Sequence, residues 1–239
     1  MKIYTTISAS LLFLNIAVYA HNCYPPINPQ QAQIIVGYGS LMNEASKKRS
    51  DPNVSDSYPV RVTGFKRGWL ARSCNKIIGF STTFLNIYPE KNSTMNAVIY
   101  KLGTAHNIYK YDARENIYCR IRIPSSHIKF LVPIPKTMRH AQIWIYANKK
   151  KDANPPSKNC PIVQSYVDVF LTGCLNIQKK FNLPNFAKQC IMTTSHWSPY
   201  WVNDRIYPRR PFIYQPNARE IDKLLEKTHP KLFDAIKIE

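Results

Sequence analysis

The feature that most constrains the fold is a series of apolar, β-branched segments in the first half of the chain. Residues 32–38, AQIIVGY, form a continuous apolar run, and residues 60–71 alternate in part between apolar and polar side chains. Segments 77–88 and 95–102 are rich in β-branched and aromatic residues, which pack well on a pleated surface. We therefore expect an antiparallel or mixed sheet that closes into a small barrel.

A helical pattern replaces the strand pattern after residue 103. Thr104 is a residue type that caps helices, and Ile108, Tyr111 and Glu115 follow at spacings of three and four. Residues with that spacing share one face of a helix. The pattern predicts a short helix with Glu115 at its inner face, where the chain passes into the next strand.

The rest of the chain alternates between strand-like and helical segments. Residues 117–123 and 141–147 are strand-like, whereas 162–181 places its apolar side chains on one helical stripe. Further helices are expected at 183–194 and 217–228. The predicted fold class is α+β, a small mixed β-barrel with surrounding helices.

The N-terminus has the pattern of a secretory signal peptide. Lys2 precedes an apolar stretch at 7–18, which ends near small residues. This stretch is shorter than the about 20 apolar residues that span a bilayer. We interpret 1–20 as a signal peptide and 21–239 as a single domain, exported to the periplasm or secreted and not held in the membrane after cleavage.

The charge balance is strongly basic, with 33 Lys and Arg against 14 Asp and Glu, a net charge of +19. Such a charge can attract nucleic acid or another anionic partner. The basic residues are scattered, however, and the runs KKR at 47–49 and KKK at 149–151 fall in predicted loops. We therefore interpret them as solvated surface charge and expect no nucleic-acid partner.

The cysteines fit an exported protein but do not suggest a metal site. Six of them allow fifteen complete pairings, among which the sequence does not choose, and free buried thiols remain an alternative. None has the spacing of a zinc ligand set, so we expect no metal.

Two of the seven glycines of the chain flank a tyrosine in VGYGSLM, residues 36–42. Glycine brings no Cβ into the path of a ligand, and a turn after a strand leaves backbone N–H groups pointing the same way. The N–H groups of Gly39, Ser40 and Leu41 would be the donors. The turn lacks the further residues of a dinucleotide fingerprint or a P-loop, so a nucleotide site is not indicated.

Glu115 is the second candidate, in YDARENIYCRI at 111–121. Asp112, Arg114 and Arg120 flank it, and a lone carboxylate in such surroundings is commonly half of an ion pair. The charge pattern by itself therefore favours a structural role.

Three motifs taken in order change that interpretation. A Y-G-S-L turn, a D-x-R-E-x-x-Y-x-R segment at 112–120, and a helix with Tyr166 seven residues before Gly173 together resemble the γ-glutamylcyclotransferase-like family. The resemblance covers roughly 32–212, and residues 186–210 resemble the C-terminal part of an exported bacterial branch. It departs at Asn116, where relatives often have Gly. Asn tolerates a left-handed conformation that would keep the turn.

The resemblance implies the fold, the reaction and the site residues. The family fold is a small mixed β-barrel with helices around it. The implied reaction is the release of 5-oxoproline from a γ-glutamyl substrate, with Glu115 as general base and acid and Tyr166 orienting the substrate, without a cofactor or metal. The substrate-binding turn falls on Val36, Gly37, Tyr38, Gly39, Ser40 and Leu41.

A nucleophilic triad is a weaker hypothesis. Ser195 and His196 are adjacent and Asp204 follows, but neighbouring residues rarely face each other, and no G-x-S-x-G motif is present. We interpret 195–205 as an aromatic segment packed on the sheet, and expect Asp204 and Arg205 to form a structural ion pair.

The competing functional hypothesis is a catalytically silent relative that binds an anionic partner through its basic surface. The glycine turn and Glu115 favour the enzyme, whereas the charge of +19 favours the silent relative.

Overall fold

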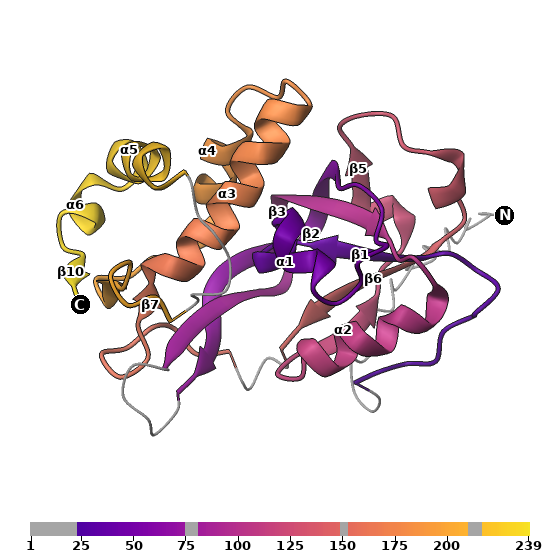
Figure 1. The fold of residues 1–239 in the computed structure, drawn as a ribbon, viewed down its shortest axis with the longest axis horizontal. Coiled ribbons are helices and arrows are strands. Elements are labelled where there is room, and N and C mark those ends of the chain that lie inside the picture. Colours follow the sequence, from indigo (N-terminus) through magenta and orange to yellow (C-terminus); the bar gives the residue numbers. More distant parts are fainter. Residues whose placement is uncertain (1–22, 75–80, 149–152, 210–216) are drawn as a thin grey trace, which may run out of the picture.

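The computed structural model describes residues 23–74, 81–148, 153–209 and 217–239, and Figure 1 shows their arrangement. The predicted signal peptide and the KKK run lie outside these residues. The described chain combines a large mixed sheet, a small second sheet and helices packed against them. The α+β class predicted from the sequence is confirmed.

The main sheet has seven strands in the order β4-β6-β1-β3-β2-β5, with β8 paired to β2. Strand β1 is antiparallel to β3 and parallel to β6, so the sheet is mixed. The strands are β1 Gln33–Gly37, β2 Tyr58–Ser73, β3 Thr82–Lys101, β4 Cys119–Arg122, β5 Ile128–Phe130, β6 Gln142–Ala147 and β8 Thr194–Ser195.

The predicted closed barrel is wrong. Closure needs a continuous ladder between the first and last strands of the order. Within the described chain β4 pairs with β6 alone and the three-residue β5 pairs with β2 alone, so no ladder joins the two ends. The sheet is open.

Strands β2 and β3 form one long antiparallel hairpin, whose ladder runs from Tyr58 opposite Ile99 to Ser73 opposite Thr82. The segments expected as separate strands at 77–88 and 95–102 therefore belong to one strand from residue 82 onward. Residues 90–93 have no partner in this ladder, because it passes from Thr63 opposite Thr94 to Phe65 opposite Pro89. The register shifts twice on the way.

Helices cover the sheet and the ends of its strands. They are α1 Glu44–Lys48, α2 Ile108–Arg114, α3 Gln164–Lys180, α4 Phe186–Met192, α5 Ala218–Thr228 and α6 Pro230–Phe233, with short 3₁₀ turns η1 Ser40–Met42, η2 Ala105–Asn107, η3 Ser125–His127 and η4 Lys136–Met138. The helices predicted at 162–181, 183–194 and 217–228 are confirmed as α3, α4 and α5. Thr104 precedes η2 but makes no side-chain capping bond, so that prediction is wrong. No helix in the described ranges is long and apolar enough to cross a membrane.

A second, three-stranded sheet ties the C-terminal region to the start of α3. It contains β7 Ile162–Val163, β9 Trp201–Asn203 and β10 Lys237–Ile238 in the order β10-β9-β7, all parallel. In Figure 1 helices α5 and α6 lie beyond α3 and α4, on the side away from α2. The aromatic segment at 195–205 packs inward as predicted, since Trp197 contacts both Trp69 and Trp201.

Four cysteines form two disulfides, Cys23 with Cys119 and Cys74 with Cys160. Cys174 and Cys190 are free and buried. Both alternatives that the sequence left open are therefore realised in one molecule. The first disulfide joins the beginning of the described chain to β4, directly after the segment that carries Glu115.

Several basic side chains lie in the interior rather than on the surface. Lys47, expected in a solvated loop, is fully buried at the end of α1, where it donates to Glu44, to Ser55 O and to Ser57 Oγ. These hydrogen bonds compensate the cost of removing the Lys47 ammonium group from water. The side chain of Arg67 is also completely buried. Part of the excess positive charge is thus structural.

Candidate functional site

The glycine turn follows β1, the buried central strand of the main sheet. The chain leaves β1 at Gly37 and enters η1 at Ser40, with Met42 N donating to Gly39 O at 3.0 Å. Among the residues that the structure describes, the N–H groups of Gly39, Ser40 and Leu41 have no hydrogen-bond acceptor in the protein. All three residues line a cavity, so these N–H groups remain candidate donors to a ligand.

A buried arginine holds this turn in place. The Nη1 of Arg67 donates to Tyr38 O at 3.0 Å and to Asn96 O at 2.8 Å, and the remaining donors bind Thr194, Cys190 and Thr193. In a trans peptide the C=O and the next N–H point in opposite directions. By binding Tyr38 O, Arg67 directs the Gly39 N–H away from itself.

Glu115 lies where α2 ends, as predicted. It is the C-cap of α2, with its N–H donating to Tyr111 O at 2.8 Å, and Tyr118 N donates back to Glu115 O at 2.8 Å. Tyr111 itself is buried and bonds Lys47 O at 2.9 Å, which anchors α2 to α1. Asn116 does not adopt the left-handed conformation, which the sequence suggested because relatives often have Gly at this position.

The Glu115 carboxylate is paired and shielded at the same time. Its Oε1 lies 3.0 Å from Arg114 Nε, and its side chain is 14% exposed. Arg114 also donates to Ser46 Oγ at 2.7 Å and to Ser40 Oγ at 3.3 Å, so one guanidinium joins the carboxylate to the glycine turn. The structural ion pair suggested by the charge pattern exists, but it lies in the wall of a cavity.

Burial raises the pKa of Glu115 above the ordinary value of 4.5, although the charges of Arg114 and Arg49 act in the opposite direction. Desolvation penalises the ionised form of a carboxyl group. A carboxyl group with a raised pKa suits proton transfer near neutral pH.

Tyr166, in the first turn of α3, reaches the turn from the other side. Its ring packs edge-on against Trp69 and Phe84, with centroids 5.9 and 5.0 Å apart. A Cβ placed on Gly39 would lie 2.9 Å from the Tyr166 hydroxyl. Glycine is needed at this position because the tyrosine comes so close to the backbone.

Gly173 brings α3 against the turn. A Cβ at this position would lie 2.6 Å from Met42 C and 2.7 Å from Met42 O, both backbone atoms at the end of η1. The seven-residue spacing between Tyr166 and Gly173 thus has a physical meaning. Gly173 lets the helix approach the turn, and Tyr166 then extends along it.

These elements line two adjoining cavities, of about 260 Å³ and about 20 Å³. Ser40, Glu115, Tyr118 and Tyr166 line both of them. The smaller cavity adds Val36, Tyr38, Gly39 and Leu41. Of the predicted site residues only Gly37 is absent from the walls, and it ends β1 directly before the turn. The structure therefore brings the three motifs to one place.

The hypothetical triad is not formed. Ser195 Oγ does lie 2.8 Å from His196 Nδ1, so the expectation that these neighbours do not face each other is wrong. His196 adopts a positive φ of 60°. Asp204, however, binds the N–H and hydroxyl of Ser165 at 2.7 and 2.6 Å, and so is engaged elsewhere.

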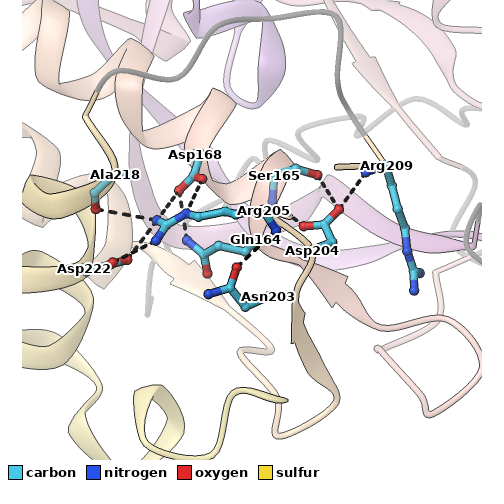
Figure 2. A network of polar contacts seen from close by, with 9 residues as sticks. All are labelled: Gln164, Ser165, Asp168, Asn203, Asp204, Arg205, Arg209, Ala218 and Asp222. Carbon is cyan, nitrogen blue, oxygen red and sulfur yellow. Dashed lines mark hydrogen bonds and ion pairs between the residues drawn. The ribbon is translucent and has the colours of Figure 1, made fainter. Parts of the chain in front are cut away.

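The predicted ion pair between Asp204 and Arg205 is also wrong. Arg205 pairs with Asp168 and Asp222, at 2.8 and 2.7 Å, and Figure 2 shows that it points away from Asp204. Asp204 is instead directed to Ser165 at the start of α3, which explains the separation. No group of His, Cys, Asp and Glu suited to a metal ion occurs in the described part of the chain.

Sequence reasoning missed Arg49 and Tyr118, which line the larger cavity, and Arg67, which holds the turn. Tyr118 lies within the motif that identified Glu115 and could have been found there. The role of Arg67 leaves no local signal, because its acceptors come from three distant segments.

No protein-family model matches the chain, and no curated protein matches it in sequence. Among solved structures, a γ-glutamyl cyclotransferase aligns with a TM-score of 0.50 at 13% identity, over 82% of this chain and 99% of its own. A human protein described as uncharacterized aligns with a TM-score of 0.50 at 14% identity, over 69% of this chain and 89% of its own. At such identities the likeness is one of fold. The chain has a fold of the γ-glutamyl cyclotransferase type.

Proposed function

We propose that the protein is a γ-glutamylcyclotransferase that releases 5-oxoproline from a γ-glutamyl peptide, with glutathione as the first candidate, or from a γ-glutamyl amine. The observation that carries the proposal is that Ser40, Glu115 and Tyr166 line both of two adjoining cavities, the smaller of which is completed by the glycine turn. At about 260 Å³ the larger cavity lies below the roughly 300–1,000 Å³ of drug-sized sites and suits a ligand of amino-acid size. The shared fold with a γ-glutamyl cyclotransferase supports the same reaction.

The reaction needs positioning and proton transfer more than it needs an external nucleophile. The α-amine of the γ-glutamyl group attacks its own γ-carbonyl carbon, forming the ring C–N bond, and the amide C–N bond to the leaving group then breaks. Holding reacting groups in a productive geometry can contribute about 7–11 kcal/mol. A cavity that fixes the folded-back conformer supplies this contribution.

Glu115 moves the protons in this scheme. The α-ammonium cannot attack until it loses a proton, which the carboxylate takes. The α-nitrogen gives up two protons on becoming the lactam N–H, and the leaving amine takes up two as it departs as an ammonium. Glu115 relays protons between them and ends in its starting state.

The N–H groups of the turn stabilise the oxyanion that forms from the carbonyl oxygen of the γ-glutamyl group. The Gly39 N–H is oriented by the bond from Arg67 to Tyr38 O, and the Ser40 and Leu41 peptides are held by the bonds from Met42 N and Asn43 N, so the donors need not reorganise during the reaction. The Tyr166 hydroxyl beside Gly39 orients the γ-glutamyl group.

The cationic side chains of the cavity favour a substrate with carboxylates. Arg49 and Arg114 line the cavity together with Glu115. A γ-glutamyl peptide carries one carboxylate on its glutamyl part and another on its leaving group. We propose that Arg49 binds the leaving-group carboxylate.

Replacing Arg49 by Gln should raise KM about tenfold for a γ-glutamyl dipeptide, because one charge-assisted contact is lost. KM for the corresponding dipeptide amide should change little. Steady-state kinetics with the two substrates measure the difference. Lys48→Gln is the matched control, since Lys48 is an exposed neighbour of equal charge that does not line the cavity. An equal rise in KM for both substrates would contradict this role.

The pH dependence follows from the raised pKa of Glu115. Since the carboxylate must be ionised to accept a proton, kcat/KM should fall on the acid side with a midpoint above the ordinary value of 4.5. A pH profile of 5-oxoproline release measures that midpoint. A profile that stays flat down to pH 4.5 would exclude Glu115 as the base.

We also propose that the reaction takes place outside the cytoplasm. The signal-peptide pattern at 1–20 and the disulfides Cys23–Cys119 and Cys74–Cys160 support an oxidising compartment.

The substrate is identified by incubating the protein with glutathione, γ-glutamyl dipeptides and γ-glutamyl-lysine, and measuring 5-oxoproline from each. A preference for substrates whose leaving group carries a carboxylate is expected. Absence of 5-oxoproline from all of them would favour the silent relative.

A further inference from the structure

Helix α3 begins without a cap of its own. Its N-cap residue is Val163, whose side chain cannot accept a hydrogen bond. The first N–H groups of a helix have no acceptor within the helix and need one from elsewhere. The requirement is strict here because Gln164 and Ser165 are buried.

The acceptor comes from Asp204, 39 residues further along the chain. Its Oδ1 accepts from Ser165 N at 2.7 Å, and its Oδ2 accepts from Ser165 Oγ at 2.6 Å and from Arg209 N at 2.8 Å. Asp204 is 1% exposed. A buried carboxylate at a helix N-terminus is favoured both by these bonds and by the helix dipole.

The small parallel sheet explains how Asp204 reaches this position. In the register of β7 and β9, Ile162 lies opposite Trp201 and Val163 opposite Val202. Both strands end shortly afterwards, so Asp204 arrives beside the first turn of α3. The cap is supplied by the strand that pairs with the one leading into the helix.

Arg205 holds the next turn of the same helix. It forms two bonds to Asp168, Nε to Oδ2 at 2.8 Å and Nη2 to Oδ1 at 2.8 Å. It forms two more to Asp222 of α5, at 2.7 and 2.8 Å. Figure 2 shows the guanidinium between the two carboxylates, so α3 and α5 are joined through one side chain. Paired bonds of this kind fix geometry as well as adding energy.

Tyr166 lies between the two attachment points, Ser165 and Asp168. At about 100° per residue, positions 165 and 168 lie near each other on the helix, whereas 166 points well away from 168. The polar contacts therefore hold a buried face of the first turns that does not line the cavity, and the tyrosine extends from another face into the cavity wall.

We propose that Asp204 and Arg205 are positioning residues that set where the Tyr166 hydroxyl lies relative to Gly39. They touch no wall of the cavity and act on the substrate through Tyr166. The proposal rests on the proposed function, because it assigns these residues to the binding of a γ-glutamyl group. The segment that carries them thereby becomes part of the site.

Asp204→Asn and Arg205→Met test this role in the full-length protein. Each should raise KM for the γ-glutamyl substrate about tenfold while kcat changes less than about threefold. Asn keeps an acceptor for Ser165 N but places a donor where Asp204 accepts from Ser165 Oγ and Arg209 N, and Met makes none of the bonds to Asp168 and Asp222. Arg205→Lys should recover only part of the loss, because it keeps the charge without the paired bonds. Asp56→Asn is the control. It breaks the exposed ion pair with Lys180 at the other end of α3 and should leave KM unchanged.

A double variant distinguishes positioning from general destabilisation. In a Tyr166→Phe background, Asp204→Asn should add little to KM, because the hydroxyl that it positions is already absent. An unchanged tenfold effect in that background would overturn the proposal, as would a fall in kcat alone.

Hydrogen exchange separates this proposal from the proposed function. Asp204→Ala removes every acceptor for Ser165 and should accelerate amide exchange in residues 164–168 while leaving 176–180 unaffected. Equal exchange in the two proteins would overturn the proposal even if turnover is normal. If the wild-type protein releases no 5-oxoproline, the proposed function fails. The assignment of Asp204 and Arg205 to substrate binding then fails as well. Hydrogen exchange still shows, in that case, whether Asp204 holds the first turn of α3.

Discussion

Replacing Glu115 by Gln is expected to lower the release of 5-oxoproline by about 10²- to 10⁴-fold, the usual contribution of a general acid and base. The amide has nearly the shape of the carboxylate but cannot accept the proton of the α-ammonium. Initial rates of 5-oxoproline formation at saturating substrate measure the effect.

The variant should still fold and bind. Arg114 keeps its bonds to Ser46 and Ser40, so the wall of the cavity stays together without the ion pair. Glu90→Gln removes an equal charge from an exposed position on β3 and should leave the rate unchanged. Turnover within a few-fold of wild type in Glu115→Gln would remove Glu115 from the mechanism.

The same variant should be at least as stable as the wild type at neutral pH. A carboxyl group whose pKa is higher in the folded state stabilises the protein below its unfolded pKa, and loses that contribution as the pH rises through the folded value. Because burial raises the pKa of Glu115, its ionised form is unfavourable for folding at neutral pH. Tm at neutral pH should not fall in Glu115→Gln, and a marked fall would show that the carboxylate is mainly structural.

Replacing Gly39 by Ala is expected to lower kcat/KM about 10²-fold, the order of loss that a displacement of about 1 Å can cause. The added methyl group would lie 2.9 Å from the Tyr166 hydroxyl, so the ring must move. Its motion is limited by Trp69 and Phe84, which pack against it on two sides. Steady-state kinetics with the preferred substrate measure the loss.

Tyr166→Phe identifies the source of this effect. Without the hydroxyl, the methyl group at position 39 has room, so the two substitutions together should cost hardly more than Tyr166→Phe alone. If Gly39→Ala costs the same in both backgrounds, the close approach of Tyr166 to the turn does not matter for catalysis.

The parts of the site that the sequence predicted are those encoded by local patterns. The glycine turn follows an apolar strand, and Glu115 stands where a helical spacing changes to a strand-like one, so both positions can be read from neighbouring residues. Tyr166 and Gly173 are likewise related by the period of one helix. Local patterns do not predict that these residues meet around one cavity. That prediction depended on the order of the three motifs, which resembles the order in the γ-glutamylcyclotransferase-like family.

The parts that the sequence did not predict depend on partners far apart in the chain. Arg67 binds Tyr38, Asn96 and residues 190–194, and nothing near Arg67 indicates those acceptors. The sequence suggests a pair between Arg205 and its neighbour Asp204, but their partners, Asp168 and Ser165, lie almost 40 residues earlier in the chain. The sequence also did not predict that the sheet is open, because a strand-like segment does not reveal which other strand its edges pair with.

We propose that the γ-glutamyl group cyclises between Glu115 and the glycine turn. Incubating the wild-type protein with glutathione and quantifying 5-oxoproline, glutamate and cysteinylglycine together tests this proposal. One 5-oxoproline should form for each cysteinylglycine released, without free glutamate. Release of glutamate in place of 5-oxoproline would show that water, and not the α-amine, attacks the γ-carbonyl, and would rule out the proposed cyclisation.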